Sequence, residues 1–299
     1  MIVSASYRTD IPAFYGEWFL NRLKAGFCRV ANPYGGKPYD VPLAGERVDG
    51  FVFWTRNAAP FRAALERLAA DGVPFVVQYS LTAYPRPLEA SVVDCERTIA
   101  AMRDLAARFG PRMVVWRYDP VLVSSLTPPA WHRETFARLA EALTAGTMPA
   151  TDEVVLSFAQ VYAKTRANTD RAAARHGFSW CDPPTDEKRA LLADLTRIAS
   201  ERELTASLCA QPALLGSGLT AARCIDVERL SKVAGRAIGA REKGNRPGCL
   251  CAESRDIGAY DSCPHGCVYC YAVRRPTVAK ANYQSHDPEG EFLLPPAKT

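Results

Sequence analysis

A strand-like segment followed by a helix-like segment recurs six times in this 299-residue chain, and this alternation constrains its fold more than any other feature. The strand-like segments cover residues 1–7, 49–57, 73–82, 112–123, 152–162 and 204–211. The helix-like segments that follow them cover residues 14–27, 60–72, 91–110, 127–146, 185–203 and 224–239. This alternation is typical of a parallel sheet with right-handed crossover connections.

Several of the strand-like segments are continuous apolar runs, as expected for strands that are covered on both faces. An open doubly wound sheet is one alternative, but no glycine-rich phosphate-binding fingerprint follows the first segment. We therefore predict an α/β fold with a complete or partial (β/α) TIM-like barrel. In such barrels the functional side chains lie at the carboxyl ends of the strands.

The boundaries of the helices are predicted from capping residues. Asp10, Ser91, Thr127 and Asp226 are expected to cap the helices that begin just after them, because their side chains accept hydrogen bonds from first-turn amides. The polar segment 31–40 is rich in glycine and proline and is long enough to be a lid.

After residue 223 the composition changes to glycine, cysteine and charge with little periodicity. We predict barrel units over residues 1–223 and a cysteine-rich segment over 224–299, packed together as one integrated domain. The formal net charge of +5 is small, so it permits an anionic or nucleic-acid substrate without arguing for either. With no apolar run near 20 residues and no signal-peptide pattern at the start, we expect a cytoplasmic protein that does not enter a membrane.

Polar residues end all six strand-like segments. They are Arg8, Asp10, Arg56, Asn57, Gln78, Ser80, Thr82, Arg117, Asp119, Gln160, Tyr162, Cys209 and Gln211. In "WRYDP", Arg117 and Asp119 share one face of a strand, where they are able to hold an anionic group and a hydroxyl or amine. The alternative for this pair is an internal ion pair between strands. With Arg8 and Arg56, they are the predicted catalytic residues.

Seven of the ten cysteines fall in the last third of the chain. They are Cys209, Cys224, Cys249, Cys251, Cys263, Cys267 and Cys270. In a reducing compartment such a cluster indicates metal binding or catalysis rather than disulfides. The last three lie in "DSCPHGCVYCYAV", residues 261–273, with the spacing C-x3-C-x2-C.

A four-iron cubane normally takes four thiolates, so the three-cysteine loop leaves one iron open. The other four cysteines match a second, closed cluster, although Cys249 or Cys251 is an alternative fourth ligand for the first. Zinc is the competing metal, with His265 as a further ligand. The C-x3-C step is unusual for zinc, so iron–sulfur is favoured.

The loop, with Tyr269 directly before its last cysteine, resembles the signature of the radical S-adenosylmethionine superfamily. "CPHGCVYCYA" is especially similar to the loop of spore photoproduct lyase. The resemblance implies that Cys263, Cys267 and Cys270 hold a [4Fe–4S] cluster whose fourth iron binds S-adenosylmethionine. One electron then cleaves this cofactor to a 5′-deoxyadenosyl radical, which abstracts hydrogen. Tyr269 is expected to contact the adenine.

Nearly the whole chain is similar to a bacterial family described as a domain of unknown function, with a radical-SAM-like cysteine cluster at its C-terminal end. The resemblance rests on "SASYRTDIPAFYGEWFLNRL", "FVFWTRN", "VVWRYDP", "CIDVERLSK" and "DIGAYDSCPHGCVYCYA". In radical S-adenosylmethionine enzymes the loop follows the first barrel strand. Here it follows "DIGAY", residues 256–260, so we predict a circularly permuted barrel in which this segment takes the place of the first strand.

The first functional hypothesis is therefore a radical S-adenosylmethionine enzyme with an auxiliary [4Fe–4S] cluster. Tyr269, Tyr271, Gln78 and Ser80 are its predicted cofactor-binding residues, and its reducing partner is an electron donor such as flavodoxin or ferredoxin. The substrate, whether small molecule, peptide or nucleic acid, stays open.

The second hypothesis is a nucleic-acid repair or modification enzyme whose basic residues contact phosphates. They are Arg236, Arg241, Lys243, Arg246, Arg274, Arg275 and Lys280. The third is a non-catalytic iron–sulfur or zinc protein that transfers electrons or senses redox state.

Overall fold

One eight-stranded parallel sheet is the central element of the computed structural model, which describes residues 1–32, 35–216 and 218–296. Its strands are β1 (Ile2–Ala5), β4 (Gly50–Thr55), β5 (Phe75–Ser80), β6 (Val114–Val121), β8 (Glu153–Phe158), β10 (Thr205–Leu208), β11 (Thr220–Ala221) and β12 (Ser254–Asp256). Every neighbouring pair in this sheet runs parallel. The prediction of an α/β fold with a parallel sheet is confirmed.

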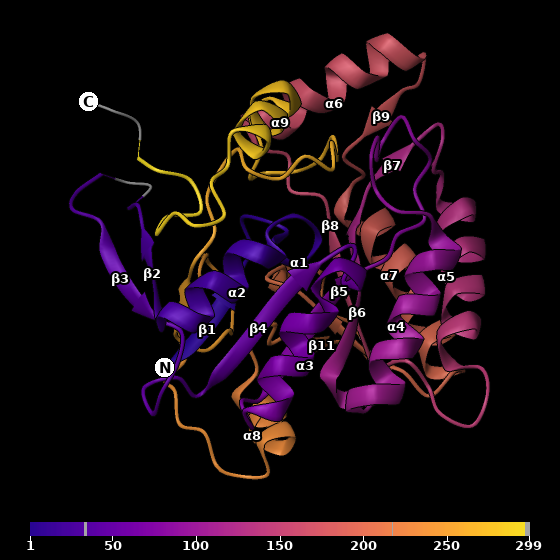
Figure 1. Cartoon of the computed structure of the whole chain (residues 1–299). Coiled ribbons are helices and arrows are strands. Elements are labelled where there is room, and N and C mark those ends of the chain that lie inside the picture. The colour runs from indigo at the N-terminus through magenta and orange to yellow at the C-terminus, as the bar shows by residue number, and fades with distance from the viewer. Residues whose placement is uncertain (33–34, 217, 297–299) are drawn as a thin grey trace.

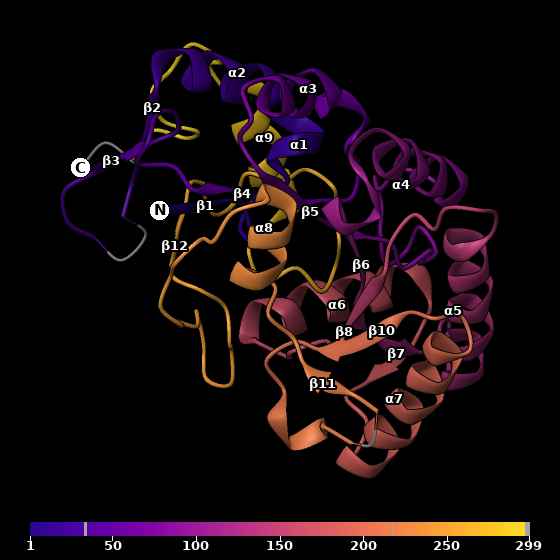
Figure 2. The ribbon, with the colours of Figure 1, turned by 90° about the horizontal axis from the view of Figure 1, so that it is seen from below.

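The strand order is β11-β10-β8-β6-β5-β4-β1-β12, so the last strand in the sequence lies beside the first (Figure 2). Ile2 of β1 is in register with Ser254 of β12. Within the described ranges no ladder joins β11 to β12. A backbone hydrogen bond of 2.9 Å from Ala252 N to Ile225 O nevertheless links the segments next to these two edges.

Helices and short strands surround the sheet (Figure 1). The helices are α1 (Ile11–Phe14), α2 (Gly16–Ala25), α3 (Arg62–Ala70), α4 (Cys95–Phe109), α5 (Pro129–Thr144), α6 (Ala163–His176), α7 (Thr185–Ser200), α8 (Val227–Ala234) and α9 (Pro276–Gln284), with 3-10 turns at Ala59–Phe61, Pro111–Met113 and Pro212–Leu214. Two antiparallel pairs lie outside the sheet: β2 (Phe27–Val30) with β3 (Tyr39–Pro42), and β7 (Val123–Ser124) with β9 (Trp180–Cys181).

Successive side chains of a strand point to opposite faces, and the two faces of this sheet are packed differently. The larger core holds Phe53, Val77 and Trp116 together with buried side chains of α2, α3, α4, α5 and α7. The other face carries small apolar residues. They are Ile2, Val52, Val76, Val115 and Val155, and they pack in one cluster with Leu230 of α8. Helix α8 and its flanking segments therefore cover this second face of the sheet.

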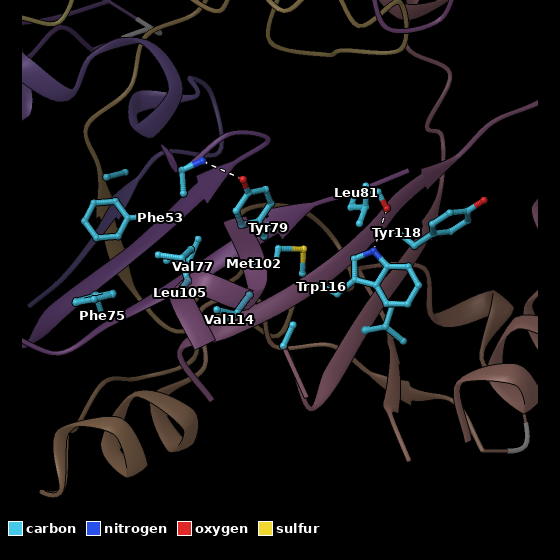
Figure 3. Close-up of a cluster of buried hydrophobic side chains, with 14 of the residues drawn as sticks. Phe53, Phe75, Val77, Tyr79, Leu81, Met102, Leu105, Val114, Trp116 and Tyr118 are labelled. Carbon is cyan, nitrogen blue, oxygen red and sulfur yellow. Dashed lines mark hydrogen bonds between the residues drawn. The ribbon is translucent and has the colours of Figure 1, made fainter. Parts of the chain in front are cut away.

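Aromatic residues with satisfied polar atoms dominate the larger core (Figure 3). Trp116 is fully buried, stacks on Phe136 at a centroid distance of 4.7 Å, and donates from Nε1 to the Leu81 carbonyl oxygen at 2.9 Å. The Tyr79 hydroxyl accepts from Ala58 N at 3.0 Å. These bonds allow large amphipathic rings to be buried without an unpaired polar group.

Replacement of Tyr79 by phenylalanine is expected to lower the free energy of unfolding by about 1–3 kcal/mol, because it leaves the buried Ala58 N–H without its acceptor. Urea denaturation measures this change. Tyr39→Phe is the matched control, since Tyr39 is 37% exposed, and it should change stability by less than about 0.5 kcal/mol. Equal effects of the two substitutions would contradict the assignment.

Two of the four predicted helix caps are confirmed. Asp10 accepts from Ala13 N at 3.0 Å, and Asp226 accepts from Glu228 N at 2.8 Å. The prediction that Ser91 caps the third helix is wrong, because α4 begins at Cys95 and Asp94 accepts from Arg97 N at 3.0 Å. The prediction that Thr127 caps the fourth helix is wrong, because α5 begins at Pro129, Pro128 takes the capping position, and the Thr127 hydroxyl donates to Leu122 O at 2.8 Å. Of the predicted lid over residues 31–40, positions 33–34 lie outside the described residues, and residues 39–40 belong to strand β3.

The described residues contain no helix with the length and apolar character needed to cross a membrane.

A cavity of about 610 Å³ lies at the amino ends of β1 and β12, lined among others by Met1, Arg241, Glu253 and Arg255. The three-cysteine segment 261–273 follows the opposite, carboxyl end of β12, so this cavity is separate from that segment.

Candidate functional site

The three-cysteine loop, residues 261–273, follows β12 and continues from the carboxyl end of that strand. Its backbone pairs with the segment after β5. Ser91 N donates to His265 O at 2.9 Å, Val268 N donates to Leu88 O at 3.1 Å, and Glu89 forms an antiparallel bridge with Cys267. The loop therefore lies beyond the carboxyl ends of β12 and β5, and its backbone is hydrogen-bonded to the segment after β5.

Buried side chains from two further strand ends hold the same loop. His265 Nε2 lies 2.8 Å from Asp10 Oδ2, beyond the end of β1. Arg56, beyond the end of β4, donates from Nη2 to the Tyr269 hydroxyl at 2.6 Å and forms an ion pair of 2.8 Å with Glu89. Burial disfavours the charge of Arg56, but Glu89 together with Tyr269, Cys267 and Asp10 outweighs burial, and the Arg56 pKa is raised.

The three loop thiols lie close enough to influence one another. Burial raises the pKa of Cys263, with further contributions from Asp10, Cys270 and Cys267. Burial also raises the pKa of Cys267 to about 12 and that of Cys270. Backbone N–H groups point toward two of these sulfurs, from His265 to Cys263 and from Ala272 and Val273 to Cys270. Such amide donors stabilise thiolates that are bound to iron–sulfur clusters.

The remaining four clustered cysteines, here called the four-cysteine group, meet at the end of β10. Cys209 Sγ lies 3.5 Å from Cys224 Sγ. Cys251 interacts with Cys224 on one side and with Cys249 on the other, and its sulfur also accepts from Ile225 N at 3.4 Å. The structure thus brings together four thiols that are separated by up to 42 positions in the sequence.

Two guanidinium groups contact the four-cysteine group. Arg117 donates from Nη1 to Cys224 Sγ at 3.0 Å, and Arg246 donates from Nη2 to Cys209 Sγ at 3.5 Å. Positive charge next to several thiols stabilises their thiolate forms, which are the metal-binding forms. The two guanidinium groups thus lower the pKa of the thiols that they contact, while contacts between the thiols and burial raise the pKa of Cys209, Cys224 and Cys251 overall.

Arg117 and Asp119, the two residues predicted to share one face of a strand, form an ion pair with each other in strand β6. Arg117 Nη2 contacts Asp119, whose other oxygen accepts from the Ser157 hydroxyl. Burial raises the Asp119 pKa, but the charge of Arg117 and the hydrogen bonds from Ser157 and Arg117, with a smaller effect of Arg246, together lower it overall. Arg117 also donates to Gln78 Oε1 at 3.1 Å, and Gln78 Nε2 donates to the Cys224 carbonyl oxygen at 2.8 Å. This pair thus holds the four-cysteine group.

Contact with Cys251 lowers the pKa of Cys249 to about 6, against the opposing effect of burial. In the metal-free protein we expect iodoacetamide to alkylate Cys249 readily at pH 7, because the thiolate is the nucleophile. The rate should fall as the pH is lowered through about 6, where the thiolate is protonated. Mass spectrometry of labelled peptides measures it. The Cys251→Ala variant lacks this contact, so the midpoint of the pH dependence of Cys249 alkylation should move to higher pH. An unchanged midpoint would contradict the assignment of the low Cys249 pKa to Cys251.

No group of three or more His, Cys, Asp or Glu side chains in the described part of the chain surrounds a point suited to a single metal ion. Thiolates on one tetrahedral zinc lie about 3.8 Å apart, because each Zn–S bond is about 2.3 Å. A cubane places one thiolate on each iron, which spreads the sulfurs farther than a single ion does. Cys209 and Cys224, at 3.5 Å, would have to separate to bind a cubane.

Arg8, a predicted catalytic residue, lies in a buried ion pair. Its Nε donates to Asp256 Oδ1 at 2.8 Å, and Asp256 also accepts from Ser4 Oγ at 3.0 Å and Ser6 Oγ at 2.8 Å. Backbone amides of Tyr7 and Gly258 donate to the same carboxylate at 3.1 and 3.0 Å. Arg8 thus joins β1 to β12.

The predicted cofactor-binding residues lie in different surroundings. Tyr269 is buried, with its hydroxyl between Arg56 and Glu89 and its ring 5.8 Å from that of Tyr84. Tyr271 is 37% exposed and donates to the Tyr7 carbonyl oxygen. Ser80 is half-buried and lies opposite Arg117 in the sheet register. Gln78, as described above, contacts the four-cysteine group.

Sequence reasoning missed Asp256 and Glu89, which carry the two buried ion pairs of the site. Asp256 begins the "DIGAY" segment, which was predicted to be a strand. The observed strand β12 ends at Asp256, so only the first residue of that segment lies in it. Glu89 lies outside any helix or strand, and no spacing or motif distinguishes it.

The fold and the site together define an α/β protein whose single large parallel sheet carries two sets of cysteines at the carboxyl ends of its strands. A model of a domain of unknown function (DUF1848) matches residues 2–272, and the chain belongs to that family. No curated protein and no solved structure shows significant similarity to the chain. The prediction that the chain belongs to a family described as a domain of unknown function is therefore confirmed.

Proposed function

We propose that this chain is a radical S-adenosylmethionine-type enzyme. Cys263, Cys267 and Cys270 would hold a [4Fe–4S] cluster with one iron left open for the cofactor. When bound, such a cluster supplies the single electron that cleaves S-adenosylmethionine. The observation that carries the proposal is the position of the loop, directly after a strand that pairs in parallel with β1 and across the carboxyl ends of its neighbours.

The strand order supports a partial TIM-like barrel with circular permutation as part of this proposal. Strands β1 to β11 follow one another in chain order, and β12 returns to the free side of β1. The hydrogen bond between Ala252 and Ile225 links the two edges that a closed barrel would join. A permuted barrel explains why a loop that follows the first strand in other enzymes comes last here.

The four-cysteine group is proposed to hold the auxiliary [4Fe–4S] cluster. Its support is the convergence of four thiols and the two guanidinium donors, Arg117 and Arg246. Binding requires the Cys209 and Cys224 sulfurs to move apart. Arg117 and Arg246 would then offset part of the negative charge of the thiolates and sulfides.

The chain's own residues are proposed to orient the reactants. Asp119 is half-buried between Arg117 and Ser157 and presents a carboxylate at the strand ends. A hydroxyl or amine of a substrate would compete with Ser157 for this carboxylate. Arg56 and Glu89 would fix the Tyr269 ring next to Cys270, and so fix the loop on the sheet.

Anaerobic reconstitution with iron and sulfide tests this function. Two cubanes predict about eight irons and eight sulfides per chain, and one cubane about four of each. With dithionite and S-adenosylmethionine, the loaded protein should release 5′-deoxyadenosine, and its reduced-state electron paramagnetic resonance signal should change when S-adenosylmethionine is added. A loaded protein with neither response is not a radical S-adenosylmethionine enzyme. Zinc in place of iron would indicate a non-catalytic metal protein.

A further inference from the structure

Positive charge is concentrated on two segments of the chain, which are helix α6 and residues 261–284 with the three-cysteine loop and α9. Together the two segments carry seven Lys or Arg side chains and two carboxylates. Their net charge of +5 equals the formal net charge of all 299 residues, so the charges of the remaining residues cancel. The basic character of the protein is therefore confined to these two segments.

The two segments are in contact with each other. Asn168 Nδ2, on α6, donates to Val273 O at 3.1 Å. Val273 is followed directly by Arg274 and Arg275, both of which are exposed. The side of α6 that carries Asn168 therefore faces the backbone just before these two arginines.

Three cations of α6 lie on that same side of the helix. At about 100° per residue, Lys164, Arg171 and Arg175 fall within about 40° of one another. Asn168 lies on the same side, and Arg171 Nη1 donates to Asn168 Oδ1 at 2.9 Å. At about 1.5 Å of rise per residue, the three cations form a row about 16 Å long. We define the basic stripe as this row and the two arginines beside it, that is, Lys164, Arg171, Arg175, Arg274 and Arg275.

The cations of the basic stripe are unpaired. Within the part of the chain that the structure describes, none of the five forms an ion pair with a carboxylate. The four arginines are exposed, and Lys164 is half-buried. The carboxylates of the two segments have other hydrogen-bond donors, because Asp170 accepts from Trp180 Nε1 at 2.8 Å and Asp261 accepts from the backbone N of Arg274 at 2.5 Å. Such a row of unpaired cations attracts a polyanion.

Two exposed tyrosines lie at the amino end of the basic stripe. Tyr162 directly precedes α6 and is 42% exposed, and Tyr271 of the three-cysteine loop is 37% exposed. Their ring centroids are 6.5 Å apart. Nucleobases stack on exposed aromatic rings, whereas an acidic protein surface is attracted by the cations alone. The combination therefore favours a nucleic acid over an acidic protein as the partner.

We propose that the basic stripe and these two tyrosines bind single-stranded nucleic acid. Four of the five cations are arginines, and arginine holds phosphate oxygens through two parallel N–H groups. A stacked strand rises by about 3.4 Å per nucleotide, so the row on α6 matches about five nucleotides. A single strand leaves its bases open to the tyrosines, and DNA and RNA share this chemistry. The binding needs no cluster, so the inference does not rest on the proposed function.

Fluorescence anisotropy of a labelled oligothymidylate of about 12 nucleotides, with the full chain without cluster, tests the proposal. Five phosphate contacts predict a slope of about −3.5 for log K against log salt concentration, because each contact with a single strand contributes about −0.7. Affinity should therefore fall about 100-fold between about 50 and 200 mM salt. An oligouridylate of the same length shows whether DNA or RNA is bound more tightly. No binding at the lower salt concentration, or a slope near zero, would refute the proposal.

Variants locate the site. Arg171→Gln and Arg175→Gln should each reduce the slope by about 0.7 and weaken binding by about fivefold near 0.1 M salt. Tyr162→Leu should weaken binding by at least about fivefold and leave the slope unchanged, because stacking releases no counterion. Thermal melting checks that each variant is folded.

Arg166→Gln is the matched control for the arginine variants. It makes the same change of charge on α6, but the Arg166 guanidinium lies 5.5 Å from the Trp180 ring, on the side of the helix away from the basic stripe. It should change affinity by less than about twofold. Equal losses in Arg166→Gln and Arg171→Gln would mean that only net charge matters, and would overturn the proposal.

Competitors show what the basic stripe recognises. Polyglutamate at an equal concentration of charge should displace little of the oligonucleotide, and complete displacement would assign the stripe to an acidic protein and refute the proposal. A duplex of the same sequence that binds more tightly than the strand would also refute it. If the strand binds as proposed but the reconstituted chain cleaves no S-adenosylmethionine, this inference stands and the proposed function fails. If the chain cleaves the cofactor but binds no strand, the proposed function stands and this inference fails.

Discussion

Replacement of Cys267 by alanine is expected to lower the iron content of the reconstituted protein from about eight to about four atoms per chain, because a cubane requires its thiolate ligands. Release of 5′-deoxyadenosine should fall by more than about 100-fold, since loss of even an outer-shell partner of a metal ligand costs about 10- to 100-fold. Iron analysis and chromatography of the reaction mixture measure the two effects. Cys267 is bridged to Glu89 through its backbone, so the loop should keep its position in the variant.

The control for this experiment is Cys181→Ala, which removes an exposed cysteine in strand β9, away from both sets of cysteines in the sequence. It should leave iron content and cofactor cleavage unchanged. Cys209→Ala should remove the other four irons while the loop keeps its own. Full iron content and full activity in Cys267→Ala would exclude the loop as the site of the reactive cluster.

Replacement of Asp256 by asparagine is expected to lower the free energy of unfolding by about 3–5 kcal/mol, because it leaves the buried Arg8 guanidinium without its counter-charge. Asp256 accepts hydrogen bonds from Ser4, Ser6, Tyr7, Arg8 and Gly258, so an amide nitrogen in this position would also face donors. Urea denaturation followed by circular dichroism measures the loss.

Asp71→Asn is the matched control, because it makes the same chemical change in an ion pair with Arg67 that lies on the surface of the protein. Exposed pairs of this kind contribute about 0–1 kcal/mol, so the control should be nearly neutral. A loss of less than about 1 kcal/mol in Asp256→Asn would mean that the ion pair does not hold β12 to β1.

The sheet and the location of the site were predictable because they depend on local patterns. Strand-like and helix-like segments alternate, and parallel strands bring their carboxyl ends to one edge. Arg117, Gln78 and the four-cysteine group, predicted at strand ends or in the cysteine-rich segment, are indeed in contact. The partners of Arg8 and Arg56 were not predictable, since Asp256 is 248 positions away from Arg8 and Glu89 lies outside regular structure.

Helix α6 shows why a clear element escaped prediction. Its buried residues are Thr165, Asn168 and Thr169, so it lacks the apolar stripe by which a helix is recognised in a sequence. The partners of this polar face explain its composition. Asn168 Nδ2 donates to Val273 O at 3.1 Å, and Thr169 Oγ1 lies 3.5 Å from Val268 O. The helix packs on the backbone of the three-cysteine loop, and polar side chains are needed there to satisfy carbonyl groups.

The place of β12 beside β1 has a consequence for how the protein is made. Ser4 and Asp256, which are hydrogen-bonded at 3.0 Å, are synthesised 252 residues apart. At about 5–20 residues per second, a ribosome needs roughly 12–50 s to cover that interval. During that time β1 has a free edge, and the thiols of the three-cysteine loop do not yet exist. Completion of the sheet therefore has to wait until residues 254–256 have been synthesised.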